Sequence, residues 1–245
     1  MKNISILSLA AMLLLVVSCH TENKAGSPDL RTFGMKGDVK EVFFSVFRLE
    51  SSSAEEQGDP WIQQDELLLS FDEAGRVTRD DYQNYYEYDD KGQVVEGTSE
   101  QTRLTRDDQG RIVCYDNTGI DDTSDDFDIM DFRKISYTYD AQGRVATEEY
   151  NGWEWTNKYT YSYEGDNIWP ASCTLESHDE GWNSEGTITY EYLAFDGKGN
   201  WTERIVTRRT KEYEEPWGDE EPEVEDYYLE TRETREILYW EDGED

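Results

Sequence analysis

One short pattern recurs along the chain and constrains its fold more than any other feature. It consists of an aromatic residue, Asp, two further residues, Gly, a polar residue and an apolar residue, as at residues 71–77. An Asp side chain can accept hydrogen bonds from backbone amides two residues on, and Gly adopts positive φ at no steric cost. Each copy therefore predicts a hairpin turn. The expected structural turn residues are Asp72, Gly75, Asp89, Gly92, Asp107, Gly110, Asp140, Gly143, Asp196 and Gly199.

The copies differ in detail but keep their spacing. The third begins with Arg106 in place of an aromatic residue, the last ends in Asn200 and Trp201, and a degenerate copy lies at residues 163–167. The glycines of the first three copies are 17 and 18 residues apart, a length that accommodates two strands and two turns. We expect the aromatic residue before each turn to pack against the apolar residue after it, across paired strands.

Between the turns, aromatic and β-branched residues alternate with polar ones, as in the tyrosines of residues 159–163. A period of two is typical of half-buried strands. Further strands are expected at residues 39–49, before the first copy, and at residues 227–239. The last stretch keeps its apolar and aromatic residues on one parity, interrupted by Glu233 and Arg235.

About a dozen strands with one aromatic face cannot stay flat and open in water. We therefore expect an all-β protein, a strongly twisted antiparallel meander of hairpins that curls into an open roll or incomplete barrel. Aromatic residues make up 13% of the chain, which is typical of a folded protein rather than a disordered one.

The repeated unit resembles the YD repeat of Rhs-type proteins over about residues 60–205, where β-hairpins coil into a long sheet. Short secreted lipoproteins of Gram-negative bacteria carry a few such repeats, and the chain is similar to them also at residues 34–40 and 196–202. The resemblance implies a β fold and a location in the cell envelope. About six turns cannot build the shell in which large Rhs proteins enclose a toxin, so toxin delivery is not implied.

The N-terminus predicts an exported protein. Residues 1–18 have the positive start, apolar run and small-residue end of a signal peptide. Residues 15–19 resemble the lipobox of bacterial lipoproteins, in which Cys19 would carry the lipid and anchor the protein to a membrane. We expect a lipidated Cys and polar tether over residues 19–29 and one β-hairpin-repeat domain over residues 30–245. The expected location is the outer membrane, on its periplasmic or surface-exposed face.

The charge excludes one class of partner. The chain has 57 acidic and 23 basic residues and a net charge of -34, whereas nucleic-acid binding needs clustered Lys and Arg. Outside the inner membrane disulfides can persist, so Cys114 and Cys173 are either bridged or two free thiols.

Few residues suggest catalysis, and we predict no catalytic residue and no enzyme activity. The two histidines are His20, in the tether, and His178, beside two acidic residues. The only candidate cofactor is Ca²⁺, because carboxylates cluster after residue 120, although the sequence there does not fit an EF-hand and a solvated loop is favoured. The candidate ligands are Asp121, Asp122, Asp125, Asp126 and Asp128.

Tryptophan offers the last signal for a binding site. Trp153, Trp155 and Trp182 are candidates for stacking on a ligand. The alternative, which we favour, is that tryptophans near the turns cover the open end of the core. The sequence thus predicts a lipid-anchored binding or scaffolding protein with an unidentified protein or glycan partner. The alternatives are a surface glycan-binding protein that uses exposed Trp and Tyr, and a glycoside hydrolase with an acid pair.

Overall fold

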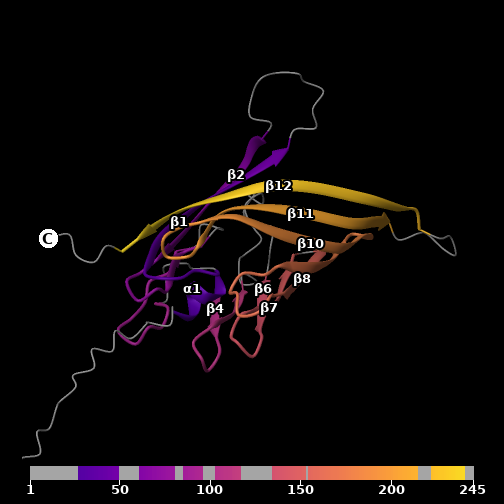
Figure 1. Cartoon of the computed structure of the whole chain (residues 1–245). Coiled ribbons are helices and arrows are strands. Elements are labelled where there is room, and N and C mark those ends of the chain that lie inside the picture. The colour runs from indigo at the N-terminus through magenta and orange to yellow at the C-terminus, as the bar shows by residue number, and fades with distance from the viewer. Residues whose placement is uncertain are drawn as a thin grey trace, which may run out of the picture.

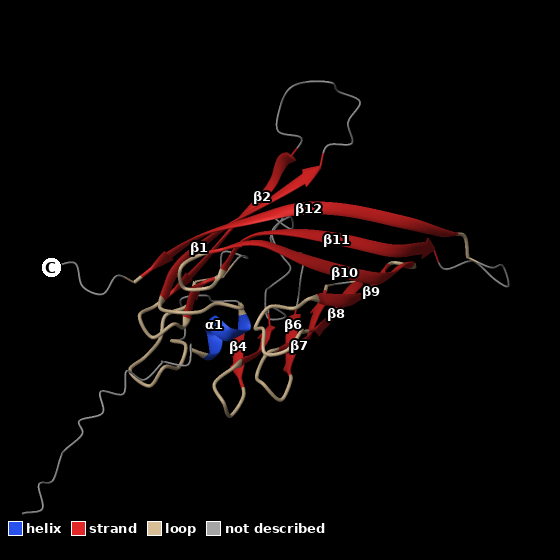
Figure 2. Ribbon diagram, in the orientation of Figure 1, coloured by secondary structure: helices blue, strands red, loops and turns tan. Residues whose placement is uncertain are grey.

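A computed structural model describes residues 27–49, 61–80, 85–95, 103–116, 134–152, 154–214 and 222–240. Within these ranges the chain forms one short helix, α1 (Pro28–Thr32), and twelve strands (Figure 2). The strands are β1 (Val39–Leu49), β2 (Trp61–Phe71), β3 (Val77–Arg79), β4 (Arg103–Arg106), β5 (Ile112–Asp116), β6 (Lys134–Tyr139), β7 (Val145–Asn151), β8 (Trp155–Ser162), β9 (Ser172–Asp179), β10 (Trp182–Phe195), β11 (Trp201–Glu214) and β12 (Val224–Tyr239).

All twelve strands belong to one antiparallel sheet, in the order β3-β2-β1-β12-β11-β10-β9-β8-β7-β6-β5-β4. From β4 to β12 each strand pairs with its neighbour in the chain, and β1 then pairs with β12. The consecutive strands β3 and β4 therefore form opposite edges, so the sheet is not closed into a barrel. Figure 1 shows β10, β11 and β12 arching over the shorter β6 to β8, with α1 below the arch. The predicted all-β, open antiparallel meander is confirmed.

The repeated turns share one hydrogen-bond pattern. In the first, Asp72 Oδ1 accepts from the backbone N of Ala74 at 3.0 Å and of Arg76 at 2.9 Å, and Gly75 has φ of 74°. The other four predicted turns repeat this arrangement, with glycine φ values of 77°, 77°, 78° and 81°. The residues flanking the turn are paired, for example Phe71 with Val77. The Asp and Gly of each copy are thus turn residues of the sheet.

Arginine after the turn glycine links one hairpin to the next, a role that the sequence pattern did not reveal. Arg144 donates from Nε to Asp140 Oδ2 at 2.7 Å, and its guanidinium lies 4.3 Å from the ring centroid of Tyr163. The Tyr163 hydroxyl donates to the carbonyl of Val145 at 2.7 Å. Arg76 with Tyr88, and Arg111 with Tyr139, make the same contacts. These contacts hold successive hairpins in the curl.

The N-terminal end of the folded part corrects the predicted domain boundary. Residues 19–29 were expected to be tether, but Pro28 and Asp29 lie in α1, and Asp29 is only 1% exposed. Ser27 Oγ caps this helix by accepting from the backbone N of Leu30 at 3.2 Å. The Ser-Pro-Asp sequence has the composition of a linker, yet it is also a helix start, with Ser at the N-cap and Pro at the first position. The prediction is therefore wrong for residues 27–29.

Asp29 connects the two edges of the sheet. Its Oδ2 accepts from the backbone N of Val77 in β3 at 2.9 Å, and its carboxylate forms an ion pair with Arg106 in β4. Tyr88 lies beside this pair: its hydroxyl donates to the Val77 carbonyl at 2.7 Å and accepts from Arg106 at 3.3 Å. Side chains therefore bridge the edges where no strand pairing does.

Replacing Asp29 by Asn should lower the free energy of unfolding by about 2–3 kcal/mol, because Arg106 loses its carboxylate in a largely buried position. Urea denaturation followed by tryptophan fluorescence measures this effect. In a double-mutant cycle with Arg106→Met, the double variant should be less destabilised than the two single variants added together, by about 1–3 kcal/mol. Strict additivity would show that the two edges are not coupled through this pair.

Candidate functional site

The curl of the sheet encloses a cavity of about 230 Å³ that is partly open to solvent. Its walls are the concave faces of β6 to β8 and β10 to β12, the end of α1 with the segment that follows it, and residues 168–170. Large aromatic residues dominate the lining. Successive side chains of a strand point to opposite faces of the sheet, and most of these aromatic residues lie at the inward positions. They include Tyr137, Tyr150, Tyr161, Tyr163, Trp169, Tyr190 and Trp201.

Two arginines from neighbouring strands enter this aromatic lining. The guanidinium carbons of Arg204 in β11 and Arg235 in β12 lie 4.3 Å and 3.4 Å from the ring centroid of Trp201. Arg204 pairs with Glu233 at 2.6 Å. Arg235 Nη1 lies 3.1 Å from the sulfur of Met35. The cavity is therefore cationic on the side formed by β11 and β12.

The two arginines differ in their electrostatic environment. Burial acts to lower the pKa of Arg204, but the carboxylate of Glu233 and the neighbouring Tyr190 and Tyr192 together outweigh burial and raise it overall. Burial lowers the pKa of Arg235 well below its ordinary value, and the nearby charge of Arg204 lowers it further. Arg235 is thus the less well compensated cation.

The opposite wall carries the single carboxylate among the described lining residues, Glu148. It accepts hydrogen bonds from the hydroxyls of Tyr150 at 2.8 Å and Tyr161 at 2.6 Å. Burial raises the pKa of Tyr161 well above its ordinary value, so this tyrosine is a neutral donor at physiological pH. The cavity therefore offers hydrogen-bond donors, aromatic surface and one acceptor, an arrangement suited to holding a polar molecule.

The structure separates the predicted stacking residues from this cavity. Trp155 packs half-buried against the main core, whereas Trp182 is 56% exposed at the start of β10. In the sheet register, Trp155 in β8 and Trp182 in β10 pair with Asp179 of β9 from its two sides. Neither tryptophan lines the cavity. Trp153 lies outside the described residues, as do Cys19 and the aspartates proposed for Ca²⁺, Asp121, Asp122, Asp125, Asp126 and Asp128.

The remaining candidates are now placed. Cys114 and Cys173 are free thiols in β5 and β9, which resolves the alternative left open by the sequence. His178 is exposed on β9, with Nδ1 at 3.0 Å from Asn183 Oδ1. In the part of the chain that the structure describes, no group of three or more His, Cys, Asp or Glu residues is arranged to hold a metal ion.

Sequence reasoning missed Arg204 and Arg235 as site residues. One signal was present: Glu233 and Arg235 interrupt the apolar register of the last strand. A charged pair at inward positions needs a partner or a ligand. Arg204 lies in β11, where polar and apolar residues do not alternate regularly in the sequence. Its contact with Glu233 depends on the register between β11 and β12.

Comparisons with known proteins do not identify this chain. No family model matches it, and no curated protein matches it in sequence. Over the described ranges, no helix combines the length and apolar character needed to cross a bilayer.

The thiol of Cys173 should be almost unreactive in the folded protein. Burial raises its pKa to about 11, so about 0.1% is thiolate at pH 8, against roughly a quarter for an unfolded cysteine. Alkylation by iodoacetamide at pH 8, followed by peptide mass mapping, should be at least about 100-fold slower in the native protein than in urea. Equal rates in the two states would contradict the buried placement of Cys173 next to Tyr190.

Proposed function

We propose that this protein is a lipid-anchored cell-envelope protein that binds a small ligand in the cavity on the concave face of its sheet, without catalysis. The observation that carries the proposal is an aromatic-lined cavity that contains a few convergent polar groups, notably Arg235 and Glu148. Such pockets are the usual form of small-molecule sites.

The packing of the cavity supports binding rather than a purely structural role. A structural core would be expected to fill this space with apolar side chains, because an interior without voids is more stable. Here the lining instead keeps charged groups on both walls, at the cost of removing them from water. Glu233 compensates Arg204 and two tyrosine hydroxyls satisfy Glu148, whereas Arg235 has no ion-pair partner among the described residues, which supports a bound ligand on that side.

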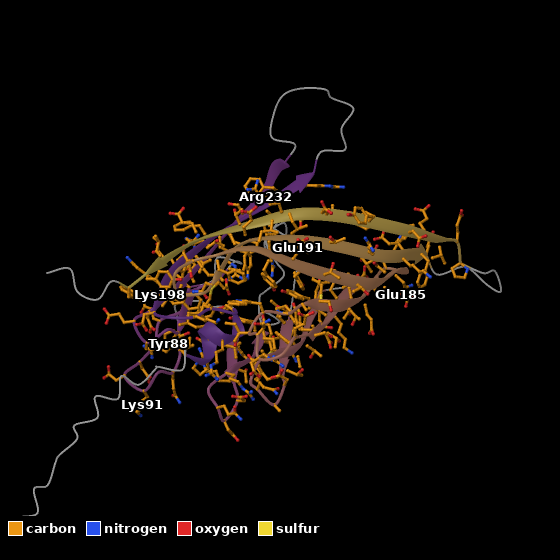
Figure 3. All side chains as sticks on the ribbon, in the orientation of Figure 1. Tyr88, Lys91, Glu185, Glu191, Lys198 and Arg232 are labelled. Carbon is orange, nitrogen blue, oxygen red and sulfur yellow. The ribbon has the colours of Figure 1, made fainter. Side chains whose placement is uncertain are left out.

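The envelope location rests on the N-terminal sequence and the acidic surface. A lipid on Cys19 would tether the domain to the outer membrane, facing the periplasm or the cell exterior. Many outer positions of the sheet are charged, as at Glu185, Glu191 and Arg232 (Figure 3), and the net charge of -34 repels anionic membrane surfaces. The domain would therefore stay in water beside the membrane that holds it.

Glycan binding is the second candidate, and the aromatic lining favours it, since aromatic rings can stack on sugars. A glycoside hydrolase needs two facing carboxyl groups, and the described lining supplies Glu148 alone. A scaffolding role through the sheet edges has no specific contact in its favour.

Replacing Cys19 by Ala should abolish lipid attachment and move the protein from the membrane to the soluble fraction. Metabolic labelling with an alkyne-tagged palmitate, followed by cell fractionation, measures both effects. Cys114→Ala is the matched control and should keep both label and location. Undiminished labelling of Cys19→Ala would exclude Cys19 as the anchor.

The binding function is tested by filling the cavity. Full-length protein in mild detergent is screened on glycan and small-metabolite arrays, together with Ile168→Trp, which places a large ring at the cavity wall. Ile205→Trp, on the outer face of β11, is the control for added aromatic surface. We expect bound ligands to be lost in Ile168→Trp and kept in Ile205→Trp. Ligands that survive in both variants would place binding elsewhere.

A further inference from the structure

Two buried donors beside the cavity have no acceptor among the described residues. They are Nε of Arg235 and Nε1 of Trp201, and both side chains line the cavity. Native proteins satisfy the great majority of such groups, because an unpaired buried donor loses its hydrogen bonds to water without replacement. Since both groups only donate, the missing partner must be an acceptor.

Arg235 also forms no ion pair among the described residues. The contacts of its guanidinium are the sulfur of Met35 and the rings of Phe44 and Trp201, and none of the ion pairs between described residues includes it. The neighbouring Arg204 has Glu233 as its partner, so Glu233 is already engaged. Although the chain has 57 acidic residues, none of the described carboxylates forms an ion pair with this largely buried cation. A buried charge of this kind is costly unless it is paired.

We propose that the cavity binds a small monocarboxylate ligand of the sugar-acid class, with the carboxylate accepting hydrogen bonds from the guanidinium of Arg235. This inference rests on the proposed binding function and names the ligand class for that same cavity. A planar carboxylate matches the fork of a guanidinium. The ring of a sugar acid would contact the aromatic wall, and its hydroxyl groups would donate to Glu148 on the opposite side.

Glu148 sets what the other end of the ligand must offer. Its carboxylate lies on the wall opposite the two arginines, so a ligand with its anionic group at Arg235 should present hydroxyl donors, and not a second anionic group, to Glu148. The volume of about 230 Å³ accommodates one sugar-sized ring. A cavity that holds only water would show no preference for glucuronate over glucose.

The test compares two probes that differ at one position of the same ring. Glucuronate and glucose are titrated into full-length protein in mild detergent, at constant ionic strength, by isothermal calorimetry and thermal unfolding. Glucuronate should bind at least about tenfold more tightly than glucose, as expected for one charge-assisted hydrogen-bonded pair. It should also raise the melting temperature in a concentration-dependent manner.

Matched variants assign the preference to Arg235. Arg235→Met removes the inward cation. Arg232→Met removes a cation three residues earlier on the outer face of the same strand (Figure 3), where Arg232 donates to Glu203. The preference for glucuronate should vanish in Arg235→Met and persist in Arg232→Met. Should Arg235→Met fail to fold, Arg235→Lys keeps the charge but removes the planar fork, and the preference should fall several-fold.

Each outcome decides the inference. Equal binding of glucuronate and glucose overturns the carboxylate assignment and leaves the binding function standing. Absence of glucuronate binding also overturns it, and the array comparison of Ile168→Trp with Ile205→Trp then decides separately whether the cavity binds another ligand. A glucuronate preference that persists in Arg235→Met overturns the role of Arg235.

Discussion

The contact on which the rest of this structure depends is a single carboxylate oxygen that accepts two backbone N–H groups. In each of the five repeated turns, Oδ1 of the Asp receives the amides two and four residues on, and the following Gly supplies the positive φ that closes the turn. This contact fixes the register of the strands on both sides, since a slip by one residue would exchange their inner and outer faces. The aromatic concave face therefore exists because the turns hold their register.

Curvature of the sheet has a different origin from register. Arg144 and its equivalents in other turns stack on the tyrosine of the next hairpin, while that tyrosine bonds a carbonyl of the previous one. These contacts draw neighbouring turns together on one side of the sheet and leave the other side wide. The result is a curl with two unpaired edges, joined by Asp29 rather than by strand pairing. A cavity lined from six strands is a direct product of that curl.

Much of the fold could be predicted because its determinants are local. The strand expected at residues 39–49 is β1 with the same bounds, and the long final strand expected over 227–239 lies within β12. Turn chemistry and period-two alternation are read over a few neighbouring residues. The pairing of β1 with β12 was not predicted, because it joins segments about 190 residues apart, and no local pattern reports it.

The site was harder to predict from the sequence, because it also depends on contacts between segments far apart in the chain. Trp153, Trp155 and Trp182 were chosen because aromatic residues near turns can be exposed, but exposure depends on how the sheet curls. Arg235 and Trp201 approach each other only after two strands pair and the sheet bends. Asp29 was assigned to a tether because its composition resembles a linker, whereas its burial depends on Arg106, far along the chain.

The pairing of β1 with β12 has a consequence for biogenesis. One edge of β1 finds its partner only when β12 is present, so the sheet cannot be completed while synthesis is under way. Contacts between such distant segments slow folding. Assembly of this topology is therefore delayed until β12 has left the ribosome.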